Sequence, residues 1–184
     1  MGVKEVRWDK GGTVRAGDCN FFMEKETKII NWNTGFFVHH RIVSAFKIIP
    51  KTVFTRNKSR IFCHFPKYHI KILLGDFNAK EGSENIFKPT IGNESLHKDS
   101  NDNGLRTVNF ATSKSLAVTS KIFSHRNIHK YTRTSADGKT LNRIDHILMD
   151  RRWHASILDI LGFCGADCDT DHYLVVAKLG KDWQ

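Results

Sequence analysis

The sequence Gly75-Asp76-Phe77-Asn78 places a carboxylate and an amide two residues apart, directly after the apolar run 71–74. Hydrolysis of a phosphodiester needs a group that activates water and a neutral donor that holds a phosphate oxygen. If the strand continues through Asn78, the two side chains share one face. The alternative is an Asx turn, which an Asp-x-Asn sequence after glycine readily forms.

A second acid, Asp145, lies within the apolar segment 142–148. Strand alternation places it on the opposite face from Ile144, His146 and Leu148. An acid in an apolar strand needs a partner, and a histidine is the simplest one. The alternative is an edge strand with Asp145 in water. His146 is assigned to packing.

The third group is an acidic run that ends in Asp171-His172. Asp167, Asp169 and Asp171 alternate as in a calcium loop. However, His172 stands where that loop needs glycine, and Lys178 where it needs glutamate, so this interpretation is rejected. An Asp-His pair that opens a strand favours metal or phosphate chemistry.

The cysteines Cys19, Cys63, Cys164 and Cys168 have neither a disulfide-framework spacing nor a complete zinc-ligand spacing, so we expect free thiols. No apolar run is long enough to span a membrane, and the first residues carry no signal pattern. We therefore expect an intracellular chain with no membrane partner.

The formal net charge is +10, and the bases are unevenly distributed. Between residues 41 and 75 there is no acid and there are eight bases: Arg41, Lys47, Lys51, Arg56, Lys58, Arg60, Lys67 and Lys71. Such a segment fits a polyanionic partner. A solvated basic surface is the alternative, because charge alone does not decide between the two.

Short β-branched and aromatic runs must position these groups. We predict strands at 35–38, 41–49, 69–74, 116–123, 143–149, 156–163 and 173–179. One helix is predicted, capped by Asn103, with Leu105, Val108, Ala111 and Thr112 on one face. Many strands with few helices predict one α+β sandwich domain over residues 1–184, with reactive side chains at strand ends.

The order of these motifs resembles the endonuclease/exonuclease/phosphatase superfamily. More closely, the sequence is similar to endonuclease domains of non-LTR retrotransposons and of their craniofacial development protein 2-like relatives. The residues that carry the resemblance are Glu5, Gly75-Asp76-Phe77-Asn78, Ile144-Asp145-His146-Ile147 and Asp171-His172-Tyr173, supported by 5–18, 34–38, 65–69, 86–96, 101–104 and 125–131.

The resemblance implies a role for each residue of the motifs. Glu5 and Asp171 would bind one Mg²⁺ or Mn²⁺. Asp76 would activate water, Asn78 would hold the phosphate, and His172, paired with Asp145, would contact the scissile phosphate. The implied fold is a DNase I-like four-layer α/β/β/α sandwich, and the implied substrate is nucleic acid, with DNA favoured and a nuclear location expected.

The sequence also departs from the family pattern. It begins just before Glu5, without the first strand, and it lacks a stretch between about Lys47 and Arg60. Arg133 stands where the family has tryptophan, and Arg143 where it has glutamine. These differences predict an incomplete sandwich and weak or absent hydrolysis. The alternatives are a nucleic-acid-binding remnant without catalysis and, less favoured, a phosphatase acting on small or lipid phosphoesters.

Overall fold

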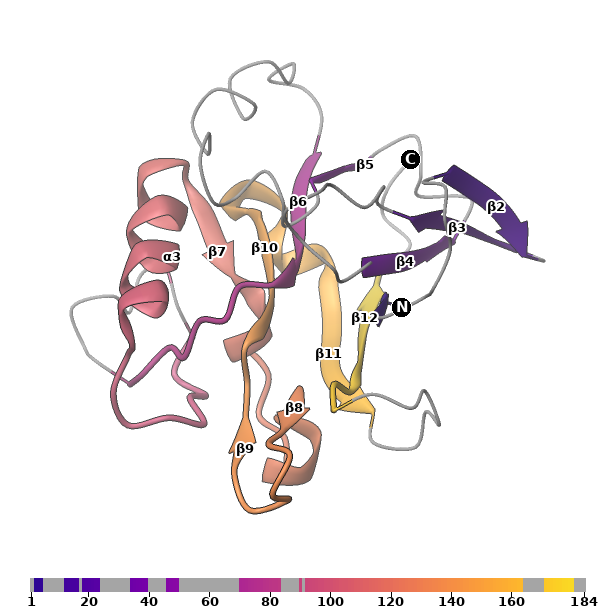
Figure 1. Ribbon diagram of the computed structural model, residues 1–184. Helices are drawn as coiled ribbons and strands as arrows, with labels where there is room; N and C mark the ends of the chain where they lie inside the picture. Colours follow the sequence, from indigo (N-terminus) through magenta and orange to yellow (C-terminus); the bar gives the residue numbers. More distant parts are fainter. Residues whose placement is uncertain are drawn as a thin grey trace.

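The computed structural model describes residues 2–4, 12–16, 18–23, 34–39, 46–49, 70–83, 90, 92–163 and 171–180 (Figure 1). Its first sheet has the strand order β1-β4-β3-β2 and is antiparallel throughout. The strands are β1 (Gly2–Lys4), β2 (Gly12–Ala16), β3 (Cys19–Met23) and β4 (Thr34–His39). The β2–β3 hairpin was not among the predicted strands.

The second sheet carries most of the residues of interest and has the order β5-β6-β10-β7. Its strands are β5 (Phe46–Ile49), β6 (Ile70–Asp76), β7 (Leu116–Val118) and β10 (Asp145–Asp150). β5 runs parallel to β6, whereas β10 is antiparallel to both β6 and β7. Because β6 and β10 are central, both of their faces are covered by apolar side chains.

One face of this sheet packs against α3 (Asp102–Ser113). Leu73, Leu148 and Val118 from the strands meet Val108 and Ala111 from the helix in one buried cluster. The period of two along β6 and the helical period along α3 together produce this layer.

The cap of α3 differs from the sequence-based expectation. Asn101, rather than Asn103, caps the helix, and its side chain accepts a hydrogen bond from the Gly104 amide at 2.8 Å. Val108 and Ala111 of the predicted face are buried, together with Thr107 and Phe110, whereas Leu105 and Thr112 are exposed.

The other face of the sheet packs against a hairpin of β11 (Ile157–Phe163) and β12 (Leu174–Leu179). Ile72 and Met149 meet Ile157 and Ile160 in a second buried cluster. β12 lies beside β1, so the hairpin and the first sheet are neighbours (Figure 1). The described residues thus form three layers, α/β/β.

Most predicted strands are confirmed within their described residues, but the strand predicted at 116–123 is wrong beyond Val118. The chain there turns into a 3₁₀ helix at Thr119–Lys121, and the Thr119 hydroxyl donates to the Ile147 carbonyl at 2.8 Å. Further 3₁₀ turns lie at Asn127–His129 and Arg151–Ser156. A small hairpin joins β8 (Arg133–Thr134) to β9 (Leu141–Asn142). Among the described residues, no helix has the length and apolarity needed to cross a membrane.

Candidate active site

Asp76 and Asp145 are cross-strand partners at the same end of the central sheet. Asp76 ends β6, Asp145 begins β10, and the antiparallel register pairs them directly. Beyond this pair, the Phe77 amide donates to the Ile144 carbonyl at 2.9 Å, so the two chains stay together. Directly opposed residues in a sheet have neighbouring side chains, which here brings two carboxylates together.

His172 completes a cluster with these two acids. Its Nδ1 lies 3.1 Å from Asp145 Oδ2, and a ligand atom from each of the three residues lies within 4.8 Å of the others. Asp76 and His172 are buried, and Asp145 is half-buried. The structure therefore confirms the predicted histidine partner of Asp145, and the alternative of an edge strand in water is wrong.

The β8–β9 hairpin holds His172 beside Asp145. The Thr132 hydroxyl accepts from the Ile144 and Asp145 amides at 2.9 and 3.1 Å, and its carbonyl accepts from the Tyr173 amide at 2.9 Å. Arg133 and His172 form an isolated antiparallel bridge. Thr132, which no sequence signal marked, thus connects two segments that lie 27 residues apart. At the far end of the hairpin, Gly138 has φ +69°, a conformation that glycine adopts without steric cost.

Asn78 does not continue β6, so the predicted shared strand face with Asp76 is wrong. The strand ends at Asp76, and Asn78 has φ +47° with its amide donating to Asp76 Oδ1 at 2.7 Å. This is the Asx-type turn that the sequence left open. Asn78 is exposed, and its backbone follows the acid around the end of the strand.

The loop after Asp76 is fixed by side chains from outside it. Asn101, the helix cap, accepts from the Lys80 amide at 3.0 Å and donates through Nδ2 to the Asn78 carbonyl at 3.1 Å. Ser100 Oγ accepts from the Gly82 amide at 2.8 Å. The N-terminus of α3 therefore anchors the segment that carries Asn78.

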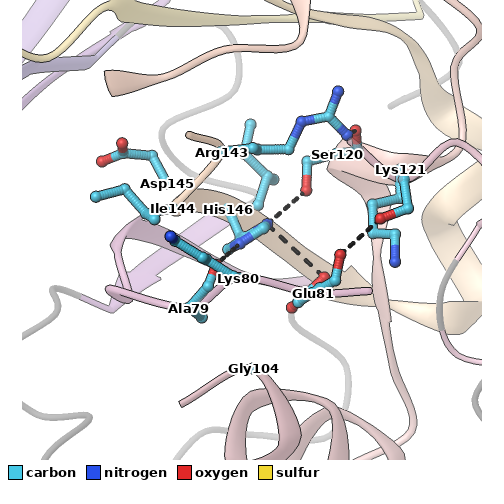
Figure 2. Close-up of polar contacts among 12 residues, drawn as sticks. Ala79, Lys80, Glu81, Gly104, Ser120, Lys121, Arg143, Ile144, Asp145 and His146 are labelled. Carbon is cyan, nitrogen blue, oxygen red and sulfur yellow. Dashed lines mark hydrogen bonds and ion pairs between the residues drawn. The ribbon is translucent and has the colours of Figure 1, made fainter. Parts of the chain in front are cut away.

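His146, from β10, anchors the same loop through Ala79 (Figure 2). Its Nε2 lies 2.7 Å from the Ala79 carbonyl, and its Nδ1 lies 3.0 Å from Ser120 Oγ. Burial lowers the pKa of His146 to about 3, so the ring is neutral near pH 7. Since a carbonyl only accepts, Nε2 carries the proton, and Nδ1 accepts from Ser120. His146 is buried as expected, but it also makes directed hydrogen bonds.

Charged side chains surround His146 in the interior. Glu81 Oε2 lies 3.8 Å from His146 Nδ1, and Lys121 Nζ donates to the Gly82 carbonyl at 2.6 Å. Arg143 donates to the carbonyls of Lys130 (2.7 Å) and Ser120 (2.8 Å). Burial lowers the pKa of the Arg143 guanidinium to about 10, opposed by the nearby charge of Glu81, so it remains a cation near pH 7. We call Glu81, Ser120, Lys121, Arg143 and His146 the buried polar support.

Sequence reasoning assigned no role to Glu81, Ser120 or Lys121. Glu81 and Lys121 are charged residues that are usually exposed, and their burial depends on contacts across the sheet. Arg143 stood out only as a departure from the family pattern. No local spacing indicates this group.

The two predicted metal ligands have different outcomes. Glu5 lies outside the described residues. Asp171 is described, and its Oδ2 accepts from Arg133 Nε at 2.6 Å, while its Oδ1 lies 3.7 Å from His172 Nε2. Cys63, Cys164, Cys168 and most of the basic segment 41–71 also lie outside the described residues.

Two carboxylates and an imidazole within 4.8 Å fit a divalent cation, because hard ions such as Mg²⁺ and Mn²⁺ prefer carboxylate oxygens. Among the residues that the structure describes, this is the one group of three or more acidic, histidine or cysteine side chains that could share an ion. The donors lie at the end of the sheet where catalytic side chains were predicted.

Residues 5–172 match the Endonuclease/Exonuclease/phosphatase family, so the chain belongs to that family. Membership confirms the predicted class of hydrolase and the DNase I-like α+β sandwich, of which the described residues show three layers. Members of the family are generally dependent on divalent metals.

The chain is also similar to individual proteins. It is 35% identical over 114 residues to craniofacial development protein 2 of Bos taurus, and 34% identical over 114 residues to that of Tragulus javanicus. These matches cover 62% of this chain but 19% and 20% of the relatives, so the chain spans about a fifth of their length. A solved 3'-5' exonuclease of Neisseria meningitidis aligns with TM-score 0.45 and 20% identity, covering 67% of this chain and 50% of that one.

Proposed function

We propose that this chain is a divalent-metal-dependent phosphodiesterase that cuts nucleic acid, with DNA as the substrate. The observation that carries the proposal is the Asp145–His172 pair beside Asp76, at the end of two adjacent strands. Family membership supplies the reaction class. Origin from a retrotransposon endonuclease and a nuclear location belong to the same proposal.

The contacts of each residue indicate the role that it would have in the reaction. The Asp145 carboxylate only accepts hydrogen bonds, so it holds the proton of His172 on Nδ1 and fixes the ring. His172 Nε2 is then the atom that exchanges a proton with the phosphate or the attacking water. Asp76, buried beside the pair, orients that water as a base. Asn78, whose backbone amide donates to Asp76, is the residue proposed to hold the phosphate.

Glu5 and Asp171 remain the predicted ligands of the ion, and the carboxylates of Asp76 and Asp145 are described oxygen donors that could share it. His172 keeps its two ring nitrogens for Asp145 and for the proton transfer. When bound, Mg²⁺ or Mn²⁺ would polarise the phosphoryl oxygens and offset the charge that develops on them. The two carboxylates of the cluster also explain why a cation is needed, since an anionic phosphate would otherwise meet like charges.

A second candidate is a nucleic-acid-binding domain with impaired catalysis. The observation that favours it is the ion pair between Arg133 and Asp171, which engages a carboxylate predicted to hold metal. The basic segment 41–71 would supply phosphate contacts in either case, and binding would fall steeply with salt.

The test is nicking of supercoiled DNA in Mg²⁺, in Mn²⁺ and with chelator. The parent is compared with an Asp76→Ala, His172→Ala double variant. Metal-dependent nicking that disappears in the double variant supports the phosphodiesterase. Equal negligible rates, with retained DNA binding, favour the second candidate and reject the first. Equal measurable rates would mean that another site, or a contaminant, does the chemistry.

A further inference from the structure

Arg133 and Asp171 form a directed ion pair at the rim of the candidate site. Arg133 Nε donates to Asp171 Oδ2 at 2.6 Å, and the two side chains are 40% and 34% exposed. The other oxygen of Asp171 lies 3.7 Å from His172 Nε2. The guanidinium therefore lies on the solvent side of a carboxylate that faces the catalytic histidine.

Backbone pairing places Arg133 next to Asp171. Arg133 and His172 are bridge partners, and the Thr134 amide donates to the Asp171 carbonyl at 2.9 Å. Most exposed ion pairs must order two long side chains, which offsets their Coulomb gain. Here one partner is a short aspartate on a paired segment, so less freedom is lost when the pair forms.

We propose that Arg133 competes with the divalent cation for Asp171 and thereby sets the metal affinity of the site. The inference rests on the metal dependence in the proposed function. A cation that approaches Asp171 must displace the guanidinium or be repelled by it.

The charge balance explains the direction of the effect. Asp171 with Arg133 has no net charge, whereas Asp171 alone offers a full negative charge to the ion. Removal of the arginine charge should raise Mn²⁺ affinity roughly three- to tenfold, in line with a partly exposed pair and the repulsion of two nearby cations. The affinity for Mg²⁺ should rise in the same way when the arginine charge is removed.

The experiment measures Mn²⁺ binding by isothermal titration calorimetry, in the absence of nucleic acid. The variants are Arg133→Met, which keeps the length of the side chain and removes its charge, Asp171→Asn, and the double variant. Arg152→Met is the matched control, because Arg152 makes a similar pair with Asp150 at 2.7 Å on another part of the surface. Circular dichroism checks that each variant is folded.

We expect tighter Mn²⁺ binding in Arg133→Met, no change in Arg152→Met, and loss of the gain when Asp171→Asn is also present. Equal affinity of the parent and Arg133→Met would overturn the proposal, and so would a gain that persists without the Asp171 carboxylate. Absence of Mn²⁺ binding in every folded variant would reject the metal dependence of the proposed function as well. If the parent nicks DNA but binds Mn²⁺ with the same affinity as Arg133→Met, the role of Arg133 is rejected and the proposed function is not.

Discussion

Asp145 and His146 are neighbours in β10, yet they belong to two regions with opposite chemistry. Asp145 faces His172 and Asp76 in the candidate active site. His146 points to the other side, into the buried polar support (Figure 2). Both regions contain histidine and carboxylate. They differ in what surrounds these groups, and this difference in environment, rather than residue type, is the basis for proposing that one pair is reactive and the other structural.

The sharpest test of this comparison is to remove each histidine in turn. His172→Ala should lower any metal-dependent nicking about 10²- to 10⁴-fold, the usual loss for a general acid or base, and should change the unfolding free energy little. His146→Ala should mainly lower stability, because the Ala79 carbonyl loses its donor in the interior. Nicking rates and urea unfolding measure the two effects. A similar loss of stability in both variants would contradict the assignment of a catalytic role to His172 and a structural role to His146.

Arg143→Ala should destabilise the fold by about 3–5 kcal/mol, since it removes a cation that offsets the charge of buried Glu81 and the donors to the Lys130 and Ser120 carbonyls. Urea unfolding provides the value. Arg152→Ala, which removes an exposed arginine that pairs with Asp150, should have a much smaller effect. If Arg143→Ala is as stable as the parent, the buried polar support does not stabilise the sheet.

The pH dependence of stability should report His146. Its folded pKa, about 3, lies below the value of 6.5 for an exposed histidine, so the unfolded chain binds a proton that the folded chain excludes. Stability should therefore fall as the pH drops from about 6.5 toward 3, by a few kcal/mol in all. Half-buried His97, whose pKa is also lowered by desolvation, adds in the same direction.

His146→Gln should flatten that profile between pH 6.5 and 4.5, above the range where most carboxylates titrate. Substitution of the exposed His154 is the control. Urea unfolding across the pH range measures both. An unchanged slope in His146→Gln would show that the ring is protonated in the folded state.

Asn101→Ala is expected to have the smallest effect, about 1 kcal/mol for the lost helix cap. It should also loosen the loop that carries Asn78, because Asn101 contacts the Lys80 amide and the Asn78 carbonyl. Hydrogen exchange at Lys80 should therefore accelerate more than exchange in the middle of α3. Equal changes along the helix would mean that the cap stabilises the helix alone.

The strands of the central sheet could be predicted because local pattern decides them. Residues 70–76 and 145–150 are apolar on both faces, and any sheet must bury them. The pairing of Asp145 with a histidine was also accessible, because an acid in an apolar strand has few partners. The identity of that histidine came from the family resemblance.

Other features depend on contacts that no local pattern encodes. Leu116–Phe123 has strand-forming residues throughout, yet the Thr119 hydroxyl bond to Ile147 turns the chain after Val118. The ion pair of Arg133 with Asp171 joins residues 38 positions apart. The burial of Glu81 and Lys121 likewise depends on how the layers meet, which sequence alone left open.

The register of β6 against β10 determines which side chains of β10 face the candidate site. Asp145 lies opposite Asp76, and His146 lies opposite Gly75. A slip of one residue would exchange the faces of every side chain in β10. The aspartate would enter the interior beside Glu81, and the histidine would emerge next to His172. A single-residue insertion within residues 145–150 should therefore be tolerated far less than one at the exposed turn around Gly138, because it would exchange the faces of the residues that follow it in β10.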